Sequence, residues 1–250
     1  MADPAESRRA GGATTARAAD GREYLRIPLS TRWVEPGDDL APLAREHVEP
    51  VREPGDVLLV SEKVMAVALG RGIPAEQLRP GRLARLLSRA VGAPMGAVGL
   101  NVPEKMQYVV ETAGAPRVIV AAIAAAVTRP LGRTGVFHRV VGGWCRDIDG
   151  MCPPYEREVI PPLAAVEARD RAEDLAADLG MGVAIIDLND SGGRIRATAR
   201  IPASELGPDE SHLISALTGN PLGQRRRSTP IGLLRRLEPA HGNERAMDTS

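Results

Sequence analysis

The stretch Gly55-Asp56-Val57-Leu58-Leu59-Val60-Ser61-Glu62-Lys63-Val64 carries the main information about the fold. A Pro-Gly-Asp turn at residues 54–56 precedes four apolar residues, 57–60, and such a short run bounded by a turn indicates a strand. Polar residues follow at once, and residues 62–69 can continue as a short helix that Gly70 closes. The stretch therefore predicts a strand that passes directly into a helix.

Strands and helices alternate along the rest of the chain. We expect strands at 22–29, 183–186, 194–201 and 231–234, and helices at 39–48, 82–91, 103–112, 165–179 and 210–218. The apolar run 118–127 fits either a buried strand or a buried helix. Residues 132–151 are rich in loop formers, and the pairs Pro153-Pro154 and Pro161-Pro162 predict a stiff connection.

This interleaving predicts the α/β (α+β) class, as a mixed-sheet domain with two lobes that meet near residue 150. Residues 1–21 are rich in Ala, Gly, Arg and Thr without periodicity, so we expect a disordered N-terminal tail. Residues 22–237 then form the folded domain, and residues 238–250 form a C-terminal tail.

The composition excludes several classes of protein. The 250 residues contain 32 Lys and Arg against 32 Asp and Glu, whereas a sequence-independent nucleic-acid binder needs excess cations to replace phosphate counterions. The longest apolar run is about half of what a membrane helix requires, and no apolar segment follows the N-terminal arginines as in a secretory signal. We therefore expect a soluble, cytoplasmic protein with no nucleic-acid or membrane partner.

The few lysines and cysteines of the chain limit which of these side chains can take part in a binding site. Arginine almost replaces lysine, because Lys63 and Lys105 are the only lysines, and a compact ammonium is hard for a planar guanidinium to imitate. Cys145 and Cys152 are separated by six residues with no histidine beside them. Zinc sites prefer about two to four intervening residues, so we expect both thiols to be reduced and free of metal.

Three polar clusters are candidates for a site. Ser61-Glu62-Lys63 follows a strand, where amides and an ammonium suit a phosphate or carboxylate, or it is an exposed helix start. Asp147 and Asp149, with Asp187 and Asp190, could bind a divalent cation, or each pair could form Asx turns. Residues 220–229, with three consecutive arginines, could clamp an anion or form a solvated loop. The Walker, dinucleotide-fold and common hydrolase motifs are absent.

Taken together, three stretches resemble the coenzyme F420-0:L-glutamate ligase family, in a shorter, divergent branch. They are Arg32-Trp33-Val34-Glu35-Pro36-Gly37-Asp38-Asp39-Leu40, the stretch at residues 55–64, and Asn220-Pro221-Leu222-Gly223-Gln224. The resemblance runs from about residue 26 to 237. It implies the two-part gamma-glutamyl ligase fold and a homodimer. It also implies that GTP (or ATP), with Mg²⁺ or Mn²⁺, activates a carboxylate of the deazaflavin precursor as an acyl phosphate, which the amine of L-glutamate attacks.

The resemblance also implies roles for individual residues. The implied nucleotide-binding residues are Thr31, Arg32, Trp33, Val34, Glu62, Lys63, Gly223, Gln224, Arg225, Arg226 and Thr229. Lys63 and Arg225 are the catalytic candidates. The implied metal ligands are Asp149, Asp187 and Gln224, with Asp190 as the alternative to Asp187 in a shifted register.

The chain departs from the family pattern at three places. Val67 and Leu69 stand where the archaeal enzymes carry Lys and Glu, and Cys152 replaces an asparagine after the first metal aspartate. Leu188 follows Asp187 where the family has a threonine. A non-catalytic nucleotide- or coenzyme-binding relative is therefore the alternative to a ligase.

Overall fold

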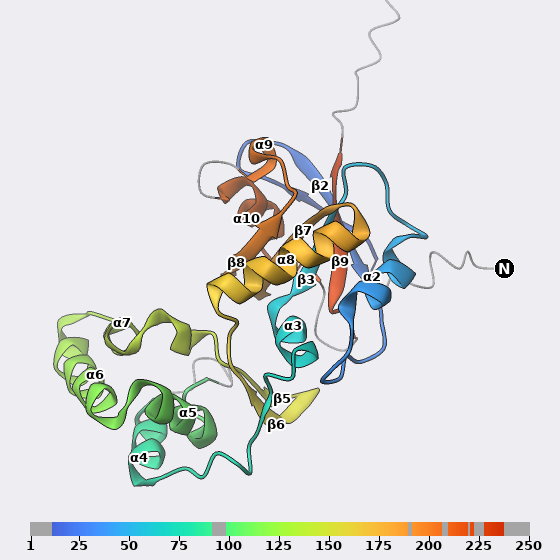
Figure 1. Cartoon of the computed structure of the whole chain (residues 1–250). Helices are drawn as coiled ribbons and strands as arrows, with labels where there is room; N and C mark the ends of the chain where they lie inside the picture. The colour runs from blue at the N-terminus through green and yellow to red at the C-terminus, as the bar shows by residue number, and fades with distance from the viewer. Residues whose placement is uncertain are drawn as a thin grey trace, which may run out of the picture. The chain divides into compact units, whose positions relative to one another are not determined.

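The computed structural model describes residues 12–91, 99–189, 192–206, 210–219, 221–222 and 228–237. These residues form two compact units (Figure 1). The first unit contains residues 12–34, 39–62 and the described residues from 164 onward, and the second contains residues 35–38 and Lys63–Leu163. The second unit is thus largely an insertion into the sequence of the first.

The first unit is built on a mixed six-stranded sheet in the order β1-β2-β9-β3-β7-β8. Its strands are β1 (Thr14–Arg17), β2 (Glu23–Leu29), β3 (Val57–Ser61), β7 (Gly182–Asn189), β8 (Gly192–Ala199) and β9 (Ile231–Leu237). β3 and β7 are parallel, and the other neighbouring strands are antiparallel. Because parallel neighbours need a long crossover, the sheet accommodates the inserted unit between β3 and β7.

Helices bury the sheet of the first unit. The helices of this unit are α2 (Leu40–Val48), α8 (Ala165–Leu179), α9 (Ala203–Leu206) and α10 (Ser211–Leu217), and α3 (Glu62–Ala68) begins where β3 ends. α8 packs against β7 and β8, and α2 packs against α8 (Figure 1). Val57 and Leu59 share a core with Leu213 and Leu217 of α10. Every residue of β3 is buried, as expected for a central strand.

The second unit combines helices with a small antiparallel sheet. Its helices are α4 (Arg82–Ala90), α5 (Pro103–Ala113), α6 (Ala115–Thr128), η2 (Arg129–Leu131), α7 (Val136–Val141) and η3 (Gly143–Arg146). The sheet has the order β4 (Ile73–Pro74), β6 (Tyr155–Ile160), β5 (Asp149–Cys152). Met106, Val118, Val141 and Val159 belong to one buried apolar cluster that joins helices to sheet.

The mixed α/β class is confirmed, and several local expectations need correction. Residues 118–127 are helical within α6. The segment 132–151, expected as loop, contains α7 and η3. Residues 155–160 form β6, which the sequence did not predict. Thr14–Arg17 lies in the expected disordered tail but pairs with β2 along its whole length, because the sheet supplies hydrogen-bond partners that an isolated segment lacks.

The hydropathy of the described residues bears on membrane insertion. No single helix among them has the length and apolar character of a membrane span. The pair Pro103–Ala113 and Ala115–Leu131 reaches that length and composition together, but it is bent by 116° at the break.

Candidate functional site

Three segments that are distant in sequence meet where β3 ends. The amide of Ser61 donates to the Pro230 carbonyl (2.9 Å), and the amide of Thr31 donates to the Ser228 carbonyl (3.0 Å). The Ser228 hydroxyl donates to the Arg32 carbonyl at 3.1 Å. The structure therefore brings the predicted nucleotide-binding residues near position 31 beside the segment that contains Thr229.

The side chains in this region differ in exposure. Val34 and Thr229 are buried, whereas the Trp33 side chain is 51% exposed. The Arg32 guanidinium donates to the Trp33 carbonyl, and the Thr31 hydroxyl donates to the Arg32 carbonyl. Val34 thus belongs to the core, and Trp33 presents an open aromatic surface.

Glu62 follows the last residue of β3, and Asp187 lies near the carboxyl end of the parallel strand β7. Ser61 is in register with Ile186, so the next residue along each chain is one of these acids. The Glu62 carboxylate is 2.8 Å from Nε of Arg196 on β8, and both side chains are largely buried. Asp187 is half-buried and lies opposite Arg194 in the β7–β8 ladder. One arginine of β8 therefore pairs with the Glu62 carboxylate, and another lies opposite Asp187 in the ladder.

In the second unit, both lysines of the chain lie near one carboxylate, that of Asp149. Lys63 Nζ is 3.2 Å from Asp149 Oδ1, with side chains 29% and 37% exposed, respectively. Lys105 is 1% exposed and donates from Nζ to the Ile148 carbonyl at 3.0 Å. Burial lowers the pKa of Lys105, and the charges of Asp149 and Cys152 partly oppose that shift.

The sequence predicted that Lys63 contacts the nucleotide and that Asp149 binds the metal. It predicted no role for Lys105. The signal for Lys105 was present, because it is one of only two lysines among 32 cationic residues. Its contact with Ile148, next to Asp149, depends on the packing of α5 against the start of β5, and no local pattern encodes that packing.

Asp149 is fixed in place by the strand that it begins. It pairs with Ile160 of β6. Gly150 has φ +82°, and a Cβ there would collide with the Glu158 carbonyl oxygen. Only glycine fits this close approach, so the backbone that presents the Asp149 carboxylate has little freedom.

The predicted metal site and arginine-rich loop stay predictions. Gly223, Gln224, Arg225, Arg226 and Asp190 lie outside the described residues. Asp149 belongs to the second unit and Asp187 to the first. Among the described residues, no three His, Cys, Asp or Glu side chains are grouped to hold one metal ion. Cys145 and Cys152 are free thiols.

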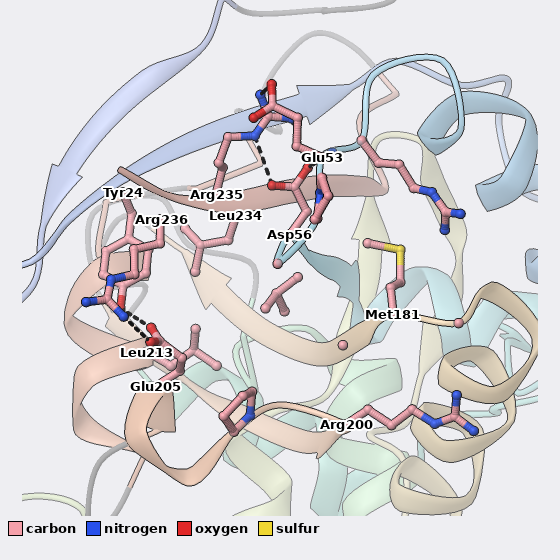
Figure 2. Close-up of a pocket in the computed structure, with 17 residues that line it drawn as sticks. Tyr24, Glu53, Asp56, Met181, Arg200, Glu205, Leu213, Leu234, Arg235 and Arg236 are labelled. Carbon is pink, nitrogen blue, oxygen red and sulfur yellow. Dashed lines mark hydrogen bonds and ion pairs between the residues drawn. The ribbon is translucent and has the colours of Figure 1, made fainter. Parts of the chain in front are cut away.

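A cavity of about 710 Å³ in the first unit was not predicted (Figure 2). Val57 and Gly182, at the amino ends of β3 and β7, line it, so it lies at the opposite end of these strands from Glu62. Several of its charged groups pair with one another. Arg235 binds Asp56, and Glu205 accepts hydrogen bonds from Arg236 and from the Tyr24 hydroxyl.

Fold and site define a mixed α/β protein with polar side chains near the carboxyl ends of two parallel strands. The F420-0:Gamma-glutamyl ligase family model matches residues 28–201, and the chain belongs to this family. Membership supports a ligase role in coenzyme F420 biosynthesis. A comparison with curated proteins gave no match. The matched region includes Lys63, Asp149 and Asp187, and it ends before the arginine-rich segment.

Proposed function

We propose that this protein uses GTP (or ATP) and Mg²⁺ or Mn²⁺ to form an amide bond between a coenzyme F420 precursor and L-glutamate. The family match across residues 28–201 carries the proposal. A substrate carboxylate oxygen attacks the γ-phosphorus and releases the nucleoside diphosphate. The glutamate amine then attacks the resulting acyl phosphate, which forms the amide and releases inorganic phosphate and a proton.

The meeting of three segments at the end of β3 supports a nucleotide site there. Thr31, Arg32, Trp33 and Thr229 would bind the nucleotide, and Glu62 would support the site by orienting Arg196. Gly223 and Gln224 with Arg225 and Arg226 would reach its phosphates. Phosphoryl transfer depends mainly on positioning and on charge neutralisation, and we assign the second task to Lys63 and Arg225.

Asp149, Asp187 and Gln224 would hold the divalent cation, with Asp190 as the alternative to Asp187. Carboxylate oxygens are the ligands that Mg²⁺ and Mn²⁺ prefer, and the family match supports this assignment. When bound, the ion would neutralise phosphate charge. The side chains of this protein would orient the carboxylate and the phosphates.

A non-catalytic nucleotide- or coenzyme-binding role is the second candidate. Val67, which stands in place of a family lysine, is 1% exposed within α3. An ammonium at this position would be buried among apolar groups, at a high desolvation cost. The apolar core of this chain has thus replaced a polar family position.

Incubation of the purified chain with nucleotide, metal, L-glutamate and the coenzyme precursor distinguishes the two candidates. A ligase yields a product heavier by one glutamate residue in mass spectrometry, together with nucleoside diphosphate. Asp149→Asn and Asp187→Asn should each abolish the product without unfolding the protein. Nucleotide binding without product under all metal and nucleotide combinations would favour the non-catalytic role.

We also propose that the protein is a homodimer that uses the open face of α6. Five large apolar side chains on this face and the following turn are 42–72% exposed: Ile119, Val120, Ile123, Val127 and Leu131. Residues 118–128 contain no charged side chain, so a second copy of the same face meets no like-charge repulsion. A stable interface buries about 800 Å² on each partner, and these five side chains would form its centre.

A further inference from the structure

The cavity of the first unit has the size of a small-molecule site. Its volume is about 710 Å³, within the range of about 300–1,000 Å³ that ligand pockets usually have. All of its lining residues belong to the first unit. It lies at the amino ends of β3 and β7, whereas the proposed nucleotide site lies at their carboxyl ends. The proposed ligase reaction therefore gives this cavity no role.

The carboxylates that line the cavity are already neutralised. Asp56 is bound by Arg235 through both of its oxygens, and Glu53 also pairs with Arg235. Glu205 accepts a hydrogen bond from Arg236 at 2.7 Å. Figure 2 shows the Arg235–Asp56 and Arg236–Glu205 pairs as separate contacts on the cavity wall. Each carboxylate among the described lining residues therefore has an arginine partner.

Among the described lining residues, Arg200 is the arginine without a partner. Its guanidinium makes no hydrogen bond or ion pair with the part of the chain that the structure describes, and it lies apart from both ion pairs in Figure 2. Arg52, by contrast, pairs with Glu49 and donates to the Leu179 carbonyl. Four arginines and three carboxylates line the cavity, which leaves one net positive charge.

The backbone at Arg200 has an unusual conformation. Its φ is +54°, in the left-handed region that residues with a long side chain rarely adopt. This residue turns the chain between β8 and α9. Gly182 allows a close approach there, because a Cβ on it would lie 3.2 Å from the Arg200 carbonyl oxygen. Backbone strain of this kind is concentrated at functional sites, which supports a binding role for this part of the cavity wall.

Apolar side chains line much of the cavity. Val57, Leu213 and Leu234 are buried members of the sheet core, and the half-buried Met181 lies on the same wall. These groups favour a ligand with an apolar body. A guanidinium binds a carboxylate through two charge-assisted hydrogen bonds, so the unpaired arginine favours a ligand with one acidic group.

We propose that this cavity binds a small organic acid that has an apolar body and one negative charge, and that the acid pairs with Arg200. The single net positive charge of the lining matches a monoanion. The inference does not depend on the ligase reaction, because no residue of the proposed nucleotide or metal site lines the cavity.

The methyl group of Met181 reports directly on ligand binding. Protein labelled with ¹³C at its methionine methyl groups is titrated with 4-phenylbutyrate at neutral pH and constant ionic strength, and Met181→Leu identifies the Met181 signal. This signal should shift and saturate with a Kd of about 1–3 mM, as expected for a ligand of this size. Met106 is fully buried in the second unit, so its signal should not move.

A charge-reversed ligand and two variants make the test specific. 4-Phenylbutylamine has a similar size but a positive charge, so it should bind at least tenfold more weakly. Arg200→Gln removes the unpaired charge at an exposed position and should weaken 4-phenylbutyrate binding about five- to tenfold. Arg171→Gln removes an exposed arginine of α8 that pairs with Asp174 outside the cavity, and it should leave the affinity unchanged.

Three results would overturn the proposal. The first is a Met181 signal that does not move at high 4-phenylbutyrate concentration, which would show that the cavity stays empty. The second is equal binding of the amine and the carboxylate, which would show that the cavity does not select for negative charge. The third is an unchanged affinity in Arg200→Gln, which would remove Arg200 as the partner of the acid.

Discussion

Arg235 binds Asp56 through two parallel hydrogen bonds. Nε of Arg235 is 2.9 Å from Oδ1 of Asp56, and Nη2 is 2.9 Å from Oδ2. The Asp56 side chain is fully buried, and it also accepts from the amide of Glu53 at 2.8 Å. This ion pair connects the turn before β3 to the C-terminal part of β9. It therefore stabilises the turn at residues 54–56, from which the sequence predicted the strand.

Asp56→Asn should therefore destabilise the protein strongly. The amide can still accept from Glu53, but the Arg235 guanidinium loses its buried anionic partner and keeps only the exposed carboxylate of Glu53. Breaking a buried pair by removing one charge costs about 3–5 kcal/mol. Urea denaturation measures this loss. Glu53→Gln is the control, because the Glu53 side chain is 61% exposed and its pairing with Arg235 is worth about 1 kcal/mol or less. Equal losses in both variants would contradict a special role for Asp56.

Because the Cys145 thiol is buried, we expect the free energy of unfolding to depend on pH. Burial raises the pKa of its thiol to about 11, and the thiol donates to the Gly142 carbonyl at 3.0 Å. The thiol ionises at a lower pH in the unfolded chain than in the folded protein. Its full contribution to the free energy of unfolding is therefore present below about pH 9 and is lost as the pH rises towards 11. The loss across this window is about 2–3 kcal/mol.

The measurement compares the free energy of unfolding at pH 8–11, under reducing conditions, for the wild type and Cys145→Ala. The variant should lose less stability with rising pH than the wild type, whatever its stability at pH 8. Parallel curves would show that the thiol ionises equally well in the folded and unfolded chains.

The exposed apolar face of α6 predicts that the protein is a dimer. Ile123→Glu places a charge at a position that is 60% exposed at the centre of the face, and burying an unpaired carboxylate in an interface is costly. Sedimentation should show a dimer for the wild type and a monomer for the variant. Leu86→Glu on α4 is the control, since Leu86 is 65% exposed but lies outside the face. A dimeric Ile123→Glu protein, or a monomeric wild type, would reject α6 as the interface.

The predictability of the fold varied with the strength of local signals. β3 and α8 were predicted because a turn bounds the first and a glycine terminates the second after a long amphipathic pattern. The run at 118–127 was ambiguous because Val, Ile and Ala suit either structure. Tertiary packing decides it, since Arg117 donates to the Val140 carbonyl of α7 at 2.8 Å. β6 was missed because three charged residues interrupt its apolar pattern.

The candidate site was predictable as a set of residues but not as a set of contacts. Lysine scarcity singled out Lys63, and the acidic Asp-Gly turn singled out Asp149. Their pairing follows from the folding of the whole second unit between α3 and β5, and no spacing rule encodes it. Glu62 was likewise predicted as a nucleotide contact, whereas its burial against Arg196 depends on β8.

The Glu62–Arg196 pair gives the last prediction. The carboxylate holds Nε of Arg196 at 2.8 Å, with side chains 5% and 13% exposed, respectively. We expect Glu62 to support the nucleotide site by orienting Arg196 rather than by binding nucleotide itself. Glu62→Gln and Arg196→Met should then weaken binding of a fluorescent GTP analogue to a similar extent. The double variant should weaken binding no further than either single change, because contacting residues that act as one unit are not additive.

Thermal unfolding of the same variants separates this effect from general destabilisation. Each single change leaves one buried charge without its main ionic partner and should lower stability, whereas the double variant removes both charges and should recover part of the loss. The coupling energy should be about 0.5–3 kcal/mol. If Glu62→Gln alone weakens nucleotide binding while Arg196→Met binds normally, the carboxylate contacts the nucleotide directly and the positioning role is wrong.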